Sequence, residues 1–186
     1  MSLMKLSDKQ IREPLYCFIE NVRHRIRIFE ELCIDKARAD LFVVTDGVLT
    51  GYEIKSDLDS YARLKKQMLA YNRFCDYCYV VIGRSHEKSI FERIAEFWGV
   101  LAVSTDENGF KVEVLRPATQ NPKAKLNSKL KLLWRRELVN ISFRNGFGKC
   151  SGKNRRFIMD KLKTNIDESK LLNEITKELF ERDYTV

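Results

Sequence analysis

Asp46 and Gly47, which stand between two apolar runs, constrain the fold more than any other feature of the sequence. An Asp-Gly pair in this setting is among the strongest signals for a two-residue turn between antiparallel strands. Such a turn fixes the register, so that residues whose numbers sum to 93 lie opposite each other. Asp40 then faces Glu53 across the hairpin, with the Cβ atoms about 5 Å apart.

This opposed pair of carboxylates is unfavourable unless it has a function. Like charges directly opposite each other destabilise a hairpin, and Asp is a poor strand former. Lys55, two residues beyond Glu53, points to the same side. A hard cation between the acids would relieve the repulsion, and Mg²⁺ is typically held by one or two carboxylates with water and phosphate. The alternative is a structural ion pair between Lys55 and Asp40 or Glu53.

The rest of the first 115 residues predicts an α/β fold, a mixed sheet with helices packed on it. Apolar spacing and Ser7 or Asp8 as N-cap predict a helix over 7–24, and three extended segments follow at 27–34, 37–45 and 48–56. We then expect a helix over 56–74 capped by Ser56 or Asp57, a buried parallel strand over 77–83 and a helix over 85–99. Strands at 100–105 and 108–115 complete the predicted order, αβββαβαβ.

Beyond a linker at 116–122, only helical patterns occur, at 128–142, 152–164 and 167–183. We therefore divide the chain into a sheet domain, residues 1–118, and a helical annex, residues 119–186. Residues 121–186 contain 16 Lys and Arg against 8 Asp and Glu, whereas the first 120 residues contain 18 of each. All the excess positive charge lies in the annex, which favours a polyanion as partner over a merely solvated basic surface.

The N-terminal residues are too polar for a signal peptide, and no apolar run approaches the ~20 residues of a membrane span. We expect a cytoplasmic protein without a membrane partner. Its five cysteines are expected to be free thiols, and Cys75 and Cys78, although spaced as CxxC, to be buried beside a strand rather than to bind zinc. His86 is expected on the surface.

The segments RADLFVV (38–44) and GYEIKSDLDSYARLKKQMLAYNRFCDYCYVVI (51–82) resemble the PD-(D/E)XK nuclease superfamily, which has the restriction-endonuclease-like fold. The nearest branch comprises poorly characterised bacterial proteins with a basic helical C-terminus. The resemblance covers roughly residues 8–115 and is specific over 31–82. It implies an αβββαβ core flanked by helices. The chain departs from the family at Ala39, where Pro is usual.

The resemblance implies roles for particular residues. The family's Asp corresponds to Asp40, and its ExK motif to Glu53 and Lys55. Gln67 and Tyr71 match the Gln-x-x-x-Tyr motif of the exonuclease-like branches. A further metal ligand usually precedes the Asp, and spacing favours Glu31 over Glu30 and Glu20, because a turn at Asp35-Lys36 would place Glu31 opposite Asp40.

These roles predict metal-assisted hydrolysis of a phosphodiester. Mg²⁺ or Mn²⁺ would be bound by Asp40 and Glu53, with Glu31 and the Ile54 carbonyl as further ligands, and Lys55 would orient the attacking water. Gln67 and Tyr71 would position the phosphate or the metal shell. The expected partner is DNA, with RNA left open, and its backbone would meet eight basic residues: Arg38, Arg63, Arg135, Arg136, Lys149, Lys153, Arg155 and Arg156. The alternative function is a non-catalytic nucleic-acid-binding adaptor or regulator. Substrate form, oligomeric state and pathway (repair, restriction or mobile elements) stay open.

Overall fold

The computed structural model describes residues 5–22, 25–107, 109–148 and 150–184. Within these ranges six strands form one mixed sheet in chain order: β1 (Arg27–Ile34), β2 (Ala37–Thr45), β3 (Val48–Lys55), β4 (Tyr77–Gly83), β5 (Gly99–Asp106) and β6 (Gly109–Arg116). The first three are antiparallel, β4 and β5 run parallel to β3, and β6 returns antiparallel at the edge. The predicted α/β class with a mixed sheet is confirmed.

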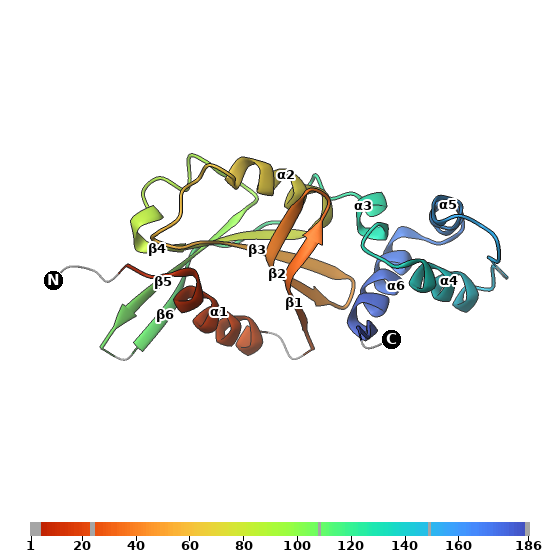
Figure 1. Cartoon of the computed structure of the whole chain (residues 1–186), viewed down its shortest axis with the longest axis horizontal. Helices are drawn as coiled ribbons and strands as arrows, with labels where there is room; N and C mark the ends of the chain where they lie inside the picture. The colour runs from red at the N-terminus through yellow and green to blue at the C-terminus, as the bar shows by residue number, and fades with distance from the viewer. Residues whose placement is uncertain (1–4, 23–24, 108, 149, 185–186) are drawn as a thin grey trace.

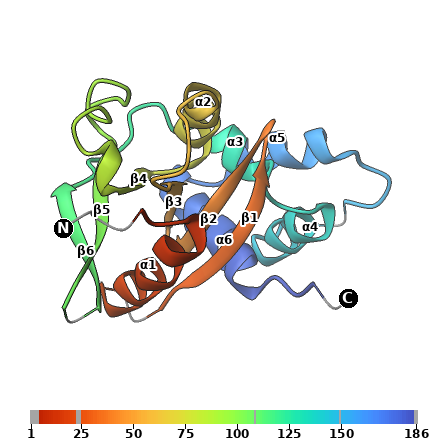
Figure 2. The same cartoon turned by 60° about the vertical axis from the view of Figure 1, so that its left-hand side comes forward.

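The helices divide between the two faces of the sheet (Figures 1 and 2). α1 (Asp8–Val22) packs Ile11, Leu15 and Ile19 against Leu41 of β2 and other residues of one face. α2 (Leu64–Phe74) covers the opposite face, where it shares a second core with the annex helices. Both faces are therefore buried, which explains why β4, in the middle of the sheet, has an almost continuously apolar sequence.

The annex contains α3 (Leu126–Leu130), α4 (Arg135–Arg144), α5 (Arg155–Asn165) and α6 (Glu168–Glu181). α6 packs on β2 and β3 at the end where the hairpin turns. There the Gly47 N–H donates to Thr176 Oγ1 at 2.9 Å, and Arg27 Nη1 donates to the Phe180 carbonyl oxygen at 2.6 Å. The proposed domain boundary near residue 118 stays a prediction, although all four annex helices follow the last strand.

The hairpin register matches the sequence analysis. Thr45 pairs with Val48, and the ladder continues outward to Leu41 opposite Tyr52, with every pair summing to 93. The turn at Asp35-Lys36 likewise sets the pairing of β1 with β2. Both registers rest on short turns flanked by apolar residues, and in a sheet with two buried faces a slip by one residue would exchange the residues of the two faces.

Three helix predictions were wrong in part. α2 begins at Leu64 rather than at 56, because Ser56 and Asp57 hydrogen-bond elsewhere: Asp59 Oδ2 accepts from Ser56, and Asp57 accepts from Leu6. The segment 85–99 contains only a 3₁₀ turn, η1 (Arg84–His86), followed by irregular turns, although its apolar residues Ile90 and Ile94 are buried. The helix predicted over 128–142 is divided into α3 and α4 between Lys131 and Trp134.

His86 is buried, contrary to the surface position expected for it. Its Nε2 lies 2.8 Å from the Ser56 carbonyl oxygen, and its ring packs edge-on against Tyr61. Cys75 and Cys78 are buried free thiols at the start of β4, as predicted. No helix in the described ranges is long and apolar enough to cross a membrane.

Candidate functional site

The ring of Tyr71 on α2 lies directly on β3 because residue 51 is glycine. A Cβ atom at Gly51 would lie 2.5 Å from Tyr71 Cδ1 and 2.7 Å from Cys75 Sγ. The absent side chain therefore leaves the space that the ring occupies. Tyr71 is fully buried. It is a core aromatic, yet its polar end reaches the acidic pair.

The hydroxyl of Tyr71 is inserted between β2 and β3. It accepts a hydrogen bond from the Asp40 N–H at 3.1 Å and donates one to the Tyr52 carbonyl oxygen at 3.0 Å. The ladder between the two strands ends at the neighbouring pair, Leu41 and Tyr52. Tyr71 thus replaces direct strand pairing at this point, and its buried hydroxyl contacts the backbone N–H of Asp40.

The Asp40 carbonyl oxygen is also withdrawn from the sheet. It accepts a hydrogen bond from Arg12 Nη1 at 3.1 Å, and the β1–β2 ladder skips Asp40 although it continues on both sides. Arg12 belongs to α1 and was missed by the sequence analysis. It occupies the turn next to the apolar stripe, and no sequence signal separates it from a solvated helix residue. Asp40 is therefore held by side chains from two helices.

The carboxylate of Asp40 points toward β3, where its Oδ2 accepts the Ile54 N–H at 2.7 Å. Burial raises the pKa of Asp40 to about 6, although the Ile54 N–H and the charge of Lys55 lower it. Burial and then the charge of Asp40 raise the pKa of Glu53 to about 7, against the opposing effect of Lys55. The opposed acids predicted from the hairpin do interact, because the charge of Asp40 makes Glu53 harder to ionise.

Lys55 lies on the same side as Glu53 and pairs with it. Its Nζ donates to Glu53 Oε1 and, at 3.2 Å, to the Ile54 carbonyl oxygen. Both side chains are buried. Such a pair fits an ExK motif, and it equally fits the structural ion pair that the sequence left as the alternative.

Three buried side-chain oxygens have no hydrogen-bond partner within the described structure, Thr50 Oγ1, Glu53 Oε2 and Gln67 Oε1, and Gln67 lines the same cleft as Asp40. A buried oxygen without a donor is costly unless a cation or water satisfies it. Two carboxylates and an amide oxygen suit a hard divalent cation whose coordination is completed by water and phosphate. The described residues include no group of three or more His, Cys, Asp and Glu placed to hold a metal. The residues thus fit a Mg²⁺ or Mn²⁺ that is partly hydrated, not one enclosed by protein.

Glu31, the predicted additional ligand, lies opposite Asp40 by register, between the pairs Glu30–Leu41 and Leu32–Ala39. Its φ of 52° is unusual for a residue other than glycine. Its carboxylate accepts from Arg12 Nη2 at 3.2 Å and pairs with Arg38 Nε at 2.7 Å. Two arginines therefore hold Glu31.

The two lesser candidates for the additional ligand lie elsewhere. Glu30 is exposed, with one contact to Arg12 at 3.5 Å. Glu20 is exposed on α1. Neither is placed opposite Asp40 by the register, and the order of preference for the additional ligand stays a prediction.

An open cleft of about 480 Å³ gives access to Asp40 and Gln67. Its lining contains three acids and five basic residues, the basic ones being Arg12, Lys36, Arg38, Arg63 and Lys66. Arg38 and Arg63, both predicted to contact nucleic acid, lie here with exposed side chains. Basic side chains around buried acids can hold the oxygens of a phosphodiester while the acids hold a cation.

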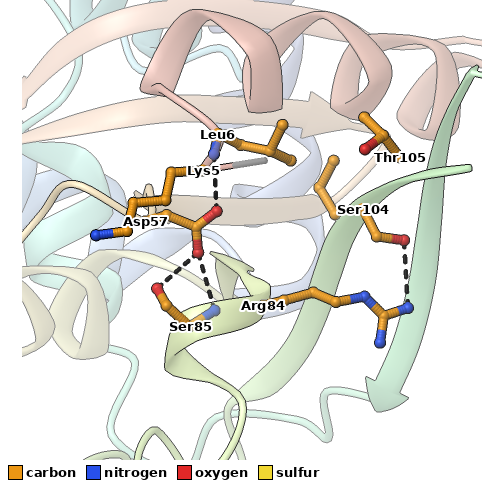
Figure 3. Close-up of a pocket in the computed structure, with 8 residues that line it drawn as sticks. Lys5, Leu6, Asp57, Arg84, Ser85, Ser104 and Thr105 are labelled. Carbon is orange, nitrogen blue, oxygen red and sulfur yellow. Dashed lines mark hydrogen bonds between the residues drawn. The ribbon is translucent and has the colours of Figure 1, made fainter. Parts of the chain in front are cut away.

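A second cavity, of about 240 Å³, lies beside the last residues of β5 and the segment that follows β4, and Figure 3 shows its lining. Asp57 forms one wall and accepts the Leu6 N–H at 2.8 Å, the Ser85 N–H at 2.9 Å and the Ser85 hydroxyl at 2.6 Å. Arg84 reaches across to Ser104 Oγ at 3.4 Å. Asp57 therefore connects the segment before α1 to the end of β4, and both of its carboxylate oxygens accept hydrogen bonds in this connection.

The annex residues predicted to bind nucleic acid fall into two groups. Arg135, Arg136 and Arg155 hydrogen-bond to carbonyl oxygens of other annex segments and so hold the annex together. Lys153 and Arg156 are exposed. Lys149 lies outside the described residues.

Together the fold and site define an α/β protein with a buried acidic pair below a basic cleft. The family model of bacteriophage P4 protein cII matches residues 10–185. The chain belongs to this family. No curated protein matches it. Among solved structures, a protein of unknown function from Silicibacter pomeroyi matches with 15% identity and a TM-score of 0.49, over 82% of this chain and 100% of that one.

Proposed function

We propose that this protein is a metal-dependent DNA phosphodiesterase, a nuclease with the PD-(D/E)XK arrangement. One observation carries the proposal: the half-buried Asp40 and the buried Glu53 interact and have raised pKa values, and Glu53 Oε2 has no hydrogen-bond donor among the described residues. Burying two like charges is unfavourable for stability alone. A cation that binds both acids offsets this cost, and a phosphodiester is the substrate that such a cation and the basic cleft can share.

The residues of the site would divide the work as follows. Asp40, Glu53 and the Ile54 carbonyl would hold Mg²⁺ or Mn²⁺, which when bound polarises the phosphate and lowers the pKa of a water. Arg38 and Arg63 would bind phosphate oxygens at the mouth of the cleft.

Lys55 would orient the attacking water, while Glu53 fixes its ammonium group. The water oxygen bonds to phosphorus as the bond to the leaving oxygen breaks, and the water gives up its proton while the leaving oxygen gains one. Gln67 would orient a phosphate oxygen or a water through its unpartnered amide. Tyr71 and Arg12 would act indirectly, by fixing the backbone of Asp40 through their hydrogen bonds to it.

A non-catalytic nucleic-acid-binding protein is the second candidate. The observation that favours it is that the ammonium and two acids of the site are already paired: Lys55 with Glu53, and Glu31 with Arg12 and Arg38. In such a protein the acids would be structural and the cleft would bind the backbone without cleaving it.

The setting we propose is the cytoplasm, supported by five free cysteines, which suit a reducing compartment. Of repair, restriction and mobile-element roles, the last is supported by the family's name, which is that of a bacteriophage protein.

A cleavage assay separates the two candidates. The purified chain is incubated with supercoiled, linear duplex and single-stranded DNA, in Mg²⁺, Mn²⁺ or chelator. The proposal predicts cleavage of at least one form with metal, none with chelator, and none by Asp40→Asn. Binding without cleavage of any form, in either metal, would support the non-catalytic alternative.

A further inference from the structure

A basic groove of about 610 Å³ lies in the annex, and its volume exceeds the 480 Å³ of the cleft. It is lined by Asn127, Lys131, Arg155, Arg156, Asp160 and Lys163, and we call it the annex groove. Lys131 follows α3, and the last four residues belong to α5. The groove thus lies between two helices that both present cations to it.

The cations of the annex groove differ in how free they are. Arg155 Nη2 donates to the carbonyl oxygens of Lys131 and Leu133, each at 2.6 Å, and so builds the groove. The Arg156 side chain is 93% exposed. Its only ion pair in the described structure is with Asp160, where Arg156 Nε lies 3.9 Å from Asp160 Oδ2. Lys131 is exposed and has no ion pair among the described residues. Arg156 and Lys131 are therefore the cations available to bind an anionic ligand.

The segment that forms the annex groove contains few acids of its own, although Lys129 and Arg144 pair with acids outside it. Residues 121–163 contain 13 Lys and Arg but only two acids, Glu137 and Asp160. Glu137 is buried and paired with Arg182. Asp160 is the remaining acid, and it lies in the annex groove, where it pairs with Lys163 at 2.8 Å. The field outside the groove is positive, and one carboxylate weakens it at the centre.

The annex groove is connected to the cleft by α2. Arg63, Lys66 and Gln67 at the start of this helix line the cleft, and near its end the Arg73 carbonyl oxygen accepts the Lys125 N–H at 3.0 Å, just before α3. In Figure 1, α2, α3 and α5 follow one another along the upper side of the molecule. An α2 of 11 residues spans roughly 16 Å, the length of about 5 base pairs.

We propose that the annex groove binds the phosphodiester backbone of a DNA duplex whose scissile region lies in the cleft, so that one duplex contacts both. The inference rests on the proposed function in its choice of DNA as the polyanion. It adds a second contact site, with Lys131 and Arg156 as its phosphate-binding residues and Asp160 as an element that limits affinity. The cleft alone would not require a duplex longer than a few base pairs.

The test measures DNA binding by fluorescence anisotropy in chelator, so that cleavage plays no part. Lys131→Glu and Arg156→Glu should each weaken binding to a duplex of about 20 base pairs and lower the slope of log affinity against log salt by about one. Lys177→Glu, on the exposed side of α6, makes the same charge change outside the groove and should have much less effect. Arg155 is avoided because it holds the groove together.

Asp160→Asn supplies a result that misfolding cannot imitate. Removing this charge frees Lys163 and deepens the positive field, so affinity should rise several-fold and the salt slope should steepen. Glu113→Gln, an exposed acid on β6, is the matched control and should leave affinity nearly unchanged.

The proposal is overturned if Lys131→Glu and Arg156→Glu leave the slope unchanged, or if Lys177→Glu weakens binding as much as they do. The first result would mean that the annex groove does not contact DNA phosphates. The second would mean that the variants act only through the net charge of the protein. A protein that binds through the groove without cleaving DNA would retain this inference and lose only the catalytic proposal.

Discussion

The Tyr71 hydroxyl takes the place of direct pairing between β2 and β3 at Asp40. It accepts the Asp40 N–H at 3.1 Å and donates to the Tyr52 carbonyl oxygen of β3 at 3.0 Å. The helix that carries Gln67 thus also fixes the carboxylate opposite Glu53. A disturbance of α2 should therefore affect the acidic pair as well as the cleft.

Tyr71→Phe tests this connection. The variant keeps the ring but leaves a buried N–H and a buried carbonyl without their partner, which should lower the free energy of unfolding by about 1–3 kcal/mol. It should also weaken Mn²⁺ binding, measured by calorimetry, because Asp40 is no longer fixed. Tyr79→Phe is the control, since its hydroxyl accepts only one long bond, from the Ala118 N–H at 3.4 Å. Equal effects of the two variants would deny Tyr71 its positioning role.

The acidic pair should make the metal-free protein less stable as pH rises. The pKa values of Asp40 and Glu53, about 6 and about 7, are raised in the folded state, so their contribution to stability is complete below about pH 4. It is lost as pH rises through 6 and 7. The free energy of unfolding of Glu53→Gln, relative to that of the wild type, should therefore rise by on the order of 2 kcal/mol between pH 5 and pH 8.

Denaturant unfolding in chelator at several pH values measures this difference. Because Mn²⁺ displaces protons from the acids, its affinity for the wild type should rise over the same pH range. A difference between the two proteins that is constant with pH would contradict the raised pKa values.

Lys55→Met removes the one cation that is paired with Glu53. The buried carboxylate is left uncompensated, so we expect a loss of about 3–5 kcal/mol at pH 8, shrinking as Glu53 becomes protonated below pH 7. The double variant Glu53→Gln, Lys55→Met should recover much of the loss. Should Lys55→Met alone prove as stable as the wild type at pH 8, the buried pair would carry no stabilising role.

Gln67→Leu separates stability from function. The amide oxygen is buried without a donor, so replacing the side chain by an apolar one of similar size should leave metal-free stability unchanged or slightly raised. Cleavage should fall at least tenfold because the polar contact to phosphate or metal shell is lost. Unimpaired cleavage would place Gln67 outside the reaction.

The sequence predicted the hairpin and the acidic pair because their causes are local. The turns at Asp46-Gly47 and Asp35-Lys36 fix the registers, and alternation along the strands then decides which residues share a face. Glu53, Lys55 and Gly51 share one face by this rule. The placement of Asp40, Glu53 and Lys55 on these strands needed no tertiary information beyond the pairing of neighbouring strands.

What the sequence could not predict depends on contacts between distant segments. Ser56 and Asp57 are good N-caps, yet Asp57 binds Leu6, 51 residues away, so the helix begins later. His86 was expected on the surface because its neighbours are polar, but it is buried against Ser56 and Tyr61. Arg12 reaches the Asp40 carbonyl oxygen only because α1 packs on the sheet, with its main contacts on β3 to β6.

The most direct test of the central claim, that Asp40 and Glu53 form a divalent-metal site, is a thermal melt of the wild type and Asp40→Asn, each with millimolar Mn²⁺ and with chelator. A ligand that binds only the folded state stabilises it by RT ln(1 + [L]/Kd). We predict that Mn²⁺ raises the melting temperature of the wild type and has little or no effect on Asp40→Asn, which in chelator should melt at or slightly above the wild type. A wild type that does not respond to metal, together with a destabilised Asp40→Asn, would contradict the claim and leave the acids with a structural role.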